Sequence, residues 1–201
     1  MPLRDLDFML NPGSVRNSKK AITKIAIIGD SGVGKTSLME RFVNSRFTDS
    51  YNMTIGGGFY IKKLPLGKGE SEMILISDVA GQSRFASIRS VFYSGVEIVL
   101  AVCDLSRKNT LTNLENLWIP EFLNLASKPD FRPKFQLIGN KSDLTDLLVI
   151  SLKDLEETAS KLTIKYPQIT ILKPILITSA KLNTFIEESV SSRKKIFPQF
   201  A

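Results

Sequence analysis

Residues 29–36 form a glycine-rich loop with the residue types and spacing of a phosphate-binding loop. They read Gly-Asp-Ser-Gly-Val-Gly-Lys-Thr, after an apolar run and before a segment with helical spacing. Glycines let the backbone curl so that successive N–H groups face phosphate oxygens. Lys35 supplies an ammonium group for the β- and γ-phosphates, and the Thr36 hydroxyl is a ligand for Mg²⁺. The predicted nucleotide contacts here are Ser31, Gly32, Val33, Gly34, Lys35, Thr36 and Ser37.

A second polar motif, Asn140-Lys141-Ser142-Asp143, follows an apolar run at 134–139. Guanine presents its N1–H and its exocyclic amine side by side, and the Asp143 carboxylate can accept both hydrogen bonds. Adenine lacks this pair of donors and would leave a buried charge unsatisfied. The motif therefore favours a guanine nucleotide. An ATPase or kinase built on the same phosphate loop is the disfavoured alternative.

A regular scaffold has to position these two motifs. Apolar and β-branched runs predict strands at 22–28, 58–66, 73–78, 96–102, 134–139 and 173–178, and helical spacing predicts helices at 35–45, 83–93, 109–126, 151–164 and 183–195. A glycine-containing turn at 67–70 joins the second and third strands as an antiparallel hairpin. The other strands alternate with helices, which predicts a parallel sheet covered on both faces. The ligand site should lie at the carboxyl ends of its strands.

Composition restricts the class of protein. The 201 residues are 43% apolar and 23% charged, which is typical of one globular domain. The net charge is +7, but the basic residues are spread out and not interleaved with aromatic side chains, so no specific nucleic acid partner is expected. Histidine is absent, which excludes imidazole chemistry. The one cysteine, Cys103, lies in an apolar run and fits a reducing cytoplasm.

Five ordered segments resemble those of Ras-superfamily small GTPases, closest to the Rab-like and Ras-like branches. They are Gly29–Ser37, Thr54–Gly56, Asp78–Gln82, Asn140–Asp143 and Thr178–Lys181. The resemblance implies an α/β fold of the P-loop NTPase G-domain type: a six-stranded, mostly parallel sheet with one antiparallel edge strand and about five helices on both faces. It also implies a molecular switch that binds GTP or GDP with Mg²⁺ and hydrolyses GTP to GDP and phosphate.

The resemblance assigns roles near the base and near the γ-phosphate. The residues expected at the base are Phe47, Asn140, Lys141, Asp143, Ser179, Ala180 and Lys181. Thr54 is expected to bind Mg²⁺ through its hydroxyl, and Asp78 to face the ion through water. Gly81 should donate its N–H to the γ-phosphate, while Gln82 orients the attacking water and Lys35 neutralises phosphate charge.

The same resemblance implies slow intrinsic hydrolysis, because no arginine in the first switch region is obviously placed to assist, although Arg46 is nearby. GTPase-activating proteins, exchange proteins and effectors should bind residues 47–59 and 78–93, in signalling or in processes like vesicle trafficking. We expect a monomer. The alternative is a nucleotide-locked scaffold with little turnover of GTP.

The expected organisation has three parts: an N-terminal extension at 1–20 with a short helix, a G domain at 21–197 and a tail at 198–201. No cysteine is present near the C-terminus, so prenylation is not expected for this sequence. Peripheral contact with anionic membranes would then use residues 1–10, or Arg193–Lys195 together with Phe197 and Phe200.

Overall fold

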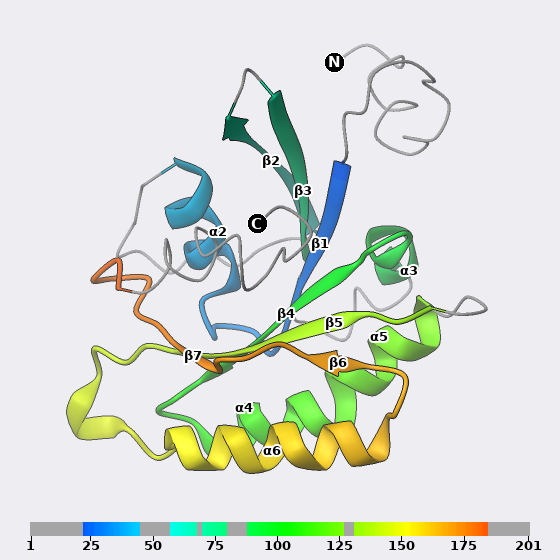
Figure 1. Cartoon of the computed structure of the whole chain (residues 1–201). Coiled ribbons are helices and arrows are strands. Elements are labelled where there is room, and N and C mark those ends of the chain that lie inside the picture. The colour runs from blue at the N-terminus through cyan, green and yellow to red at the C-terminus, as the bar shows by residue number, and fades with distance from the viewer. Residues whose placement is uncertain (1–21, 45–56, 68–69, 80–87, 127–130, 185–201) are drawn as a thin grey trace.

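The computed structural model describes residues 22–44, 57–67, 70–79, 88–126 and 131–184, which build one sheet flanked by helices (Figure 1). The strands are β1 (Ile22–Ile28), β2 (Gly57–Gly67), β3 (Glu70–Val79), β4 (Ile98–Asp104), β5 (Lys134–Asn140), β6 (Thr170–Ile171) and β7 (Leu176–Ile177). The helices are α2 (Lys35–Asn44), α3 (Arg89–Tyr93), α4 (Lys108–Asn113), a π-helical turn (Leu114–Trp118), α5 (Ile119–Leu125), a 3₁₀ turn (Thr145–Leu147) and α6 (Leu152–Lys165).

The sheet has the order β2-β3-β1-β4-β5-β6, and β7 also pairs with β5. The β2–β3 pair is antiparallel and all other pairs are parallel, which confirms the predicted hairpin and the predicted mostly parallel sheet. The strand predicted at 173–178 forms at Leu176–Ile177 (β7), and a further short strand, β6, lies before the predicted range. Pro174 lies between them and has no N–H to donate to the ladder. Because β6 and β7 both pair with β5, they occupy one position in the sheet.

Two apolar layers enclose the sheet, because side chains of a strand alternate between its faces. Ile25 and Ile27 of β1 pack with Leu38 and other apolar residues of α2. The alternate residues of β1 pack in a second cluster with α3, α4, α5 and α6. In Figure 1, α4, α5 and α6 lie below the sheet and α2 lies above it. Every residue of β4 is buried, as its continuous apolar run predicts.

The helix predicted at 109–126 spans 108–125, but its middle turn is π-helical. There the N–H of Ile119 donates to the carbonyl of Leu114, five residues back. Pro120 follows directly and has no N–H for a regular helical bond. A wider turn next to a proline is a common way to continue a helix past it. This turn also carries Trp118, whose contact with the phosphate loop is described below.

Other predicted helices match in part. The segment predicted at 83–93 is helical at Arg89–Tyr93, and residues 83–87 lie outside the described part of the chain. The described residues of the helix predicted at 183–195 are not helical, because Asn183 has φ of 59° and Thr184 pairs with Ser179. The predictions for 1–20 and for the C-terminal tail also lie outside the described residues.

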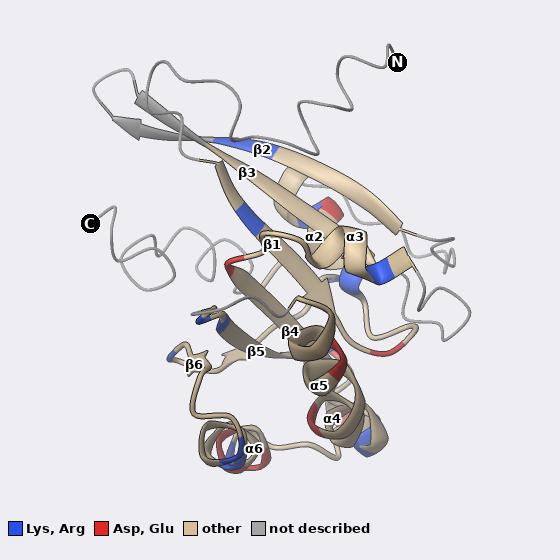
Figure 2. Cartoon of the chain, turned by 90° about the vertical axis from the view of Figure 1, so that its right-hand side faces the viewer, with Lys and Arg blue, Asp and Glu red and all other residues tan. Residues whose placement is uncertain are grey.

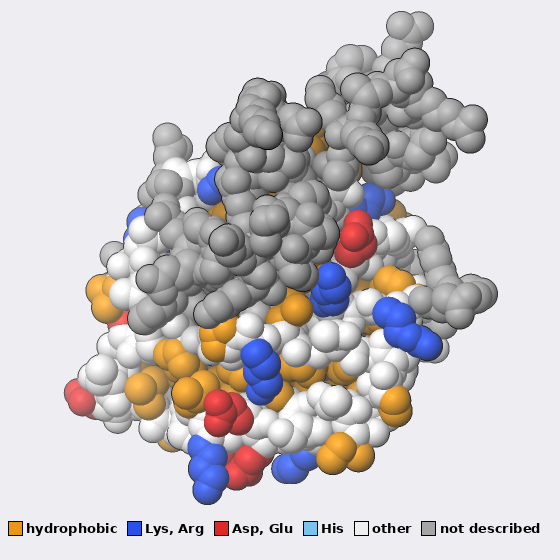
Figure 3. All heavy atoms as spheres, in the orientation of Figure 1, with side chains coloured by type: hydrophobic (Ala, Val, Ile, Leu, Met, Phe, Trp, Pro, Cys, Tyr) orange, Lys and Arg blue, Asp and Glu red, His pale blue; other side chains and the backbone are white. Residues whose placement is uncertain are grey.

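The described surface carries both signs of charge. Helix α6 contains both lysines and acidic residues, and its ribbon in Figure 2 carries both colours of charge. The lower part of the face in Figure 3 shows the same mixture beside scattered apolar side chains. None of the described helices combines the length and hydropathy required to cross a bilayer.

Candidate nucleotide-binding site

The phosphate loop lies between β1 and α2, at the carboxyl edge of the sheet. Gly29 and Gly34 have φ angles of 138° and 97°. The backbone of residues that carry a side chain rarely adopts such angles. A Cβ at Gly29 would lie 2.2 Å from the carbonyl oxygen of Val102, and a Cβ at Gly34 would lie 2.3 Å from Nδ2 of Asn140. Both glycines are therefore required by conformation and by space, and the second brings the loop against the Asn140 motif.

Lys35 is buried at the start of α2, and its ammonium group lies inside the loop. Its Nζ donates to the carbonyl oxygens of Gly29 and Asp30, at 2.8 Å each. Burial lowers the pKa of Lys35 to about 8, although the carboxylates of Asp78 and Asp30 act in the opposite direction. A phosphate anion beside this ammonium would stabilise its charged form.

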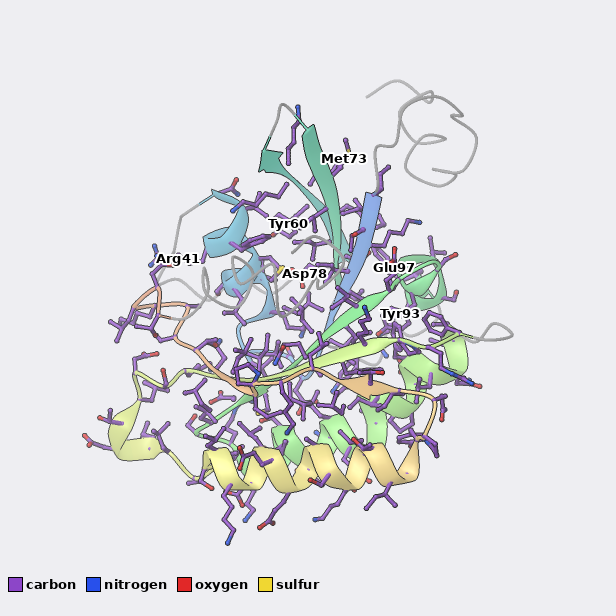
Figure 4. All side chains as sticks on the ribbon, in the orientation of Figure 1. Arg41, Tyr60, Met73, Asp78, Tyr93 and Glu97 are labelled. Carbon is purple, nitrogen blue, oxygen red and sulfur yellow. The ribbon has the colours of Figure 1, made fainter. Side chains whose placement is uncertain are left out.

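Thr36 and Asp78 bring two hard oxygen ligands together. The Thr36 hydroxyl donates to Oδ2 of Asp78 at 2.5 Å, and Asp78 lies near the carboxyl end of β3 (Figure 4). The other carboxylate oxygen, Oδ1, is buried and accepts no hydrogen bond from the residues that the structure describes. Burial raises the pKa of Asp78, although the Thr36 hydrogen bond and Lys35 act to lower it.

This pair fits Mg²⁺, which commonly binds one or two protein oxygen groups and takes its remaining ligands from phosphates and water. A cation would stabilise the carboxylate form of Asp78 and give its buried Oδ1 a partner, directly or through water. Among the described residues no group of three or more His, Cys, Asp or Glu side chains could hold a metal by itself. The remaining ligands would therefore have to come from a bound nucleotide, from solvent or from residues outside the described ranges.

Asn140 joins the phosphate loop to the segment after β7. Its Nδ2 donates to the carbonyl oxygen of Val33 at 2.9 Å. Its Oδ1 accepts hydrogen bonds from the Thr178 hydroxyl at 3.1 Å and from the Ala180 N–H at 3.2 Å. Both polar atoms of this buried amide therefore have partners, and three segments meet at one side chain.

The Asp143 carboxylate is held by the same segment. Its Oδ1 accepts a hydrogen bond of 2.5 Å from the Ser179 hydroxyl, and the N–H of Ser142 donates to the carbonyl of Thr178. Ser179 is buried and Asp143 is partly exposed. The structure thus brings together the described residues predicted at the base, and it leaves the Asp143 carboxylate accessible to a ligand.

Lys141 contacts a carboxylate that the sequence analysis did not assign to the site. Its Nζ lies 2.7 Å from Oδ2 of Asp104, the last residue of β4. Arg107 and Ser106 also donate to this carboxylate. Burial alone would raise the pKa of Asp104, but these hydrogen bonds outweigh it and lower the pKa. The position of Asp104 at the end of a central strand was the feature that could have placed it here.

A second unassigned contact fixes the phosphate loop from the side of α4 and α5. Oδ1 of Asp30 accepts a 2.6 Å hydrogen bond from the Trp118 indole, and its Oδ2 accepts a 2.7 Å bond from Asn113. The guanidinium of Arg89 lies 4.7 Å from the centre of the Trp118 ring. Arg89 in turn forms an ion pair with Glu121. Helix α3 and the phosphate loop therefore contact the same tryptophan.

Four predicted site residues, Phe47, Thr54, Gly81 and Gln82, lie outside the described residues. Their roles at the base, at the γ-phosphate and at the attacking water remain predictions.

Comparisons with known proteins agree with this geometry. The family model of the Ras family matches residues 24–193. The Ras-related protein RABG3f of Arabidopsis thaliana is 39% identical over 177 residues, which are 85% of this chain and 80% of that protein. Rab7 of Drosophila melanogaster is 41% identical over 150 residues, 74% of this chain and 71% of that protein. The Ypt/Rab-type GTPase YPT7 of Saccharomyces cerevisiae is 35% identical over 181 residues, 87% and 82% of the two chains.

Proposed function

Because this chain belongs to the Ras family of small GTPases, we propose that it is a Rab-type switch that acts in vesicle trafficking. Family members bind GTP and GDP, typically with Mg²⁺, hydrolyse GTP, and interact with regulators and effectors. The Rab and Ypt names of the similar proteins favour trafficking over other signalling processes. We assign the G domain to residues 21–197, and the family match over 24–193 supports this assignment.

The observation that carries the proposal is the junction at Asn140. This side chain joins the phosphate loop at Val33 to the segment at Thr178 and Ala180. The residues for phosphates and the residues for a base are therefore fixed relative to one another. A ligand that bridges them must carry phosphates at one end and, opposite the Asp143 carboxylate, a pair of adjacent donors at the other. A guanine nucleotide has both.

At the phosphate end, the residues would act by binding and by charge. Lys35 would contact the β- and γ-phosphates from inside the loop, and the N–H groups of the loop would donate to their oxygens. Thr36 and Asp78 would hold Mg²⁺, directly for the hydroxyl and through water for the carboxylate. When bound, Mg²⁺ supplies neutralisation of the charge on the phosphates. These contacts would position the γ-phosphoryl group for attack by water.

The conformational switch would use further residues that contact the γ-phosphate. We propose that Thr54 and Gly81 contact the γ-phosphate in the GTP state and that Gln82 orients the attacking water. Phe47 would pack on the base. Partner proteins would bind residues 47–59 and 78–93. A GTPase-activating partner would accelerate the slow intrinsic hydrolysis of GTP. A cytoplasmic protein with peripheral contact to anionic membranes fits this role.

Nucleotide binding and single-turnover hydrolysis test the proposal. The purified chain should bind GTP and GDP in the presence of Mg²⁺ and bind ATP far more weakly. It should release phosphate from GTP at a rate on the order of 10⁻³ s⁻¹ or slower. Tight GTP binding without phosphate release would indicate the nucleotide-locked scaffold, and equal binding of ATP would contradict the guanine-specific switch.

The variant Asp143→Asn gives the specificity control. Its amide can accept the N1–H of a purine and donate to a 2-oxo group, so preference should move from guanine to xanthine nucleotides. A variant with unchanged preference would show that Asp143 does not read the base.

A further inference from the structure

We propose that Arg41 of α2 is a positioning residue for guanine recognition, because it fixes the loop that orients Asp143. The inference rests on the proposed function and assigns a specificity role to a residue that none of the motifs contains. Arg41 is on the helix that begins at the phosphate loop, and it contacts the opposite end of the site.

The contacts of Arg41 span two successive carbonyl groups. Its Nε donates to the carbonyl oxygen of Ala180 at 3.0 Å, and its Nη2 donates to the carbonyl oxygen of Lys181 at 2.9 Å. Figure 4 shows Arg41 on the side of α2 nearest the segment that follows β7. A planar guanidinium can hold two adjacent acceptors at fixed spacing, whereas a lysine ammonium acts as a point charge.

The carbonyl of Lys181 is linked through hydrogen bonds to the carboxylate of Asp143, which is proposed to bind the base. In a trans peptide unit the C=O and N–H groups point in opposite directions, so fixing the carbonyl of Lys181 also orients the N–H of Leu182. That N–H donates to the Ser179 hydroxyl at 3.0 Å. The same hydroxyl donates to Oδ1 of Asp143 at 2.5 Å. Arg41 is therefore connected to Asp143 through one peptide unit and one hydroxyl.

Other described contacts also act on this loop, including the hydrogen bond of 3.2 Å from the Thr184 N–H to the carbonyl of Ser179. Ala180 is buried and its N–H is also held by Asn140, so its position does not depend on Arg41 alone. In contrast, Lys181, Leu182 and Asn183 are exposed, and Leu182 retains 60% of its accessible surface. Apolar burial thus contributes little to placing this stretch, and polar contacts have to determine where its N–H groups point.

A base analogue distinguishes this role from general stabilisation. Inosine diphosphate keeps the N1–H of guanine but lacks the exocyclic amine. The preference for GDP over IDP therefore measures the second hydrogen bond to Asp143. If Arg41 orients Asp143, its loss should weaken GDP binding more than IDP binding. A purely structural role would weaken both nucleotides by the same factor.

The experiment measures the dissociation constants of GDP and IDP for the wild-type chain, Arg41→Met, Arg41→Lys and the control Arg132→Met. Arg132 is exposed, and its Nη1 donates to the carbonyl oxygen of the neighbouring Phe131. The ratio of the IDP constant to the GDP constant should fall about tenfold in Arg41→Met, which is the effect expected from one hydrogen bond to a charged group. It should fall less in Arg41→Lys and stay unchanged in the control.

Each outcome is decisive. A wild-type preference for GDP that Arg41→Met retains would overturn the role of Arg41 and leave the proposed function intact. A wild-type chain without any guanine preference would overturn the proposed function and this inference with it. If Arg41→Met does not yield folded protein, the ratio for Arg41→Lys decides, because lysine keeps the charge and can reach one of the two carbonyls.

Discussion

The phosphate end and the base end of the site differ in how far the chain satisfies its own polar groups. At the base end, both polar atoms of Asn140 are bonded, and Asp143 is held by Ser179. At the phosphate end, Lys35 is buried with its pKa lowered to about 8, and Oδ1 of Asp78 is buried without a hydrogen-bond partner among the described residues. The described part of the chain thus preforms the base end, whereas the phosphate end has to be completed by ligands or by residues outside the described ranges.

Because of this difference, we expect the base end to determine which purine binds and the phosphate end to determine how far a ligand stabilises the folded state. A preformed base end discriminates between purines without reorganisation, because its donors and acceptors are already placed. An incomplete phosphate end makes the folded state depend on what binds there, because a ligand of the native state stabilises it by mass action. We therefore expect variants at the two ends to change different measured quantities.

The largest effect should come from Lys35→Met. Affinity for GDP should fall on the order of a thousandfold, because at least two charge-assisted hydrogen bonds to phosphate are lost. The stability of the nucleotide-free chain should change little, since the loss of two bonds to carbonyls is offset by removal of a buried charge. Titration with GDP and denaturant unfolding measure the two quantities. The exposed Lys153→Met is the matched control, and a large loss of nucleotide-free stability in Lys35→Met would contradict the comparison.

Asn140→Ala should show the opposite pattern. It leaves the Val33 carbonyl, the Thr178 hydroxyl and the Ala180 N–H without their shared partner in a buried position. We expect the free energy of unfolding to fall by about 3 to 4 kcal/mol without nucleotide and by at least as much with it, because Asn140 is also a predicted contact of the base. Chemical denaturation in the absence and presence of GDP checks this. A loss of stability that appears in one state alone would show that the base end is not preformed.

A smaller effect should appear with pH. The pKa of Lys35 is about 8 in the folded chain, and it is 10.5 for an exposed lysine, as in the unfolded chain. Between these values the unfolded chain binds more protons, so the contribution of Lys35 to stability rises with pH. Relative to Lys35→Met, the nucleotide-free wild type should gain about 2 to 3 kcal/mol from pH 7 to pH 10.5.

Subtracting the variant removes the contributions of Tyr60 and Cys103, whose pKa values burial raises to about 12 and which titrate in both proteins. Bound GDP should abolish this gain of stability with pH in the wild type, because phosphate stabilises the charged form of the lysine. A flat difference across this range without nucleotide would contradict the assigned burial of the ammonium group.

Sequence reasoning was strongest where local pattern decides structure. The apolar runs at β1, β4 and β5 and the hairpin between β2 and β3 predicted the sheet, because burial and turn chemistry act over a few residues. The prediction of one strand at 173–178 was wrong in detail, because Pro174 cannot donate a hydrogen bond to the β-ladder. The phosphate loop and the Asn140 motif were found because their chemistry requires adjacent residues.

The contacts that were missed join distant segments. Arg41 meets Ala180 across 139 positions, and Asp30 meets Trp118 across 88 positions. An exposed-looking arginine in a helix and an aspartate in a loop have many permitted partners, and the sequence does not specify which one the fold brings near. These contacts follow from the packing of α2 and of the π-helical turn against the sheet, which no local pattern determines.

The hydrogen bond between Trp118 and Asp30 has an optical consequence. The chain contains one tryptophan, so its intrinsic fluorescence comes mainly from a single indole whose N–H is bonded to the phosphate loop. Arg89 of α3 lies over the same ring. Emission from this chromophore would respond to any change in the carboxylate or the guanidinium beside it. The unlabelled protein thus carries its own reporter of the phosphate loop, readable in real time during nucleotide exchange.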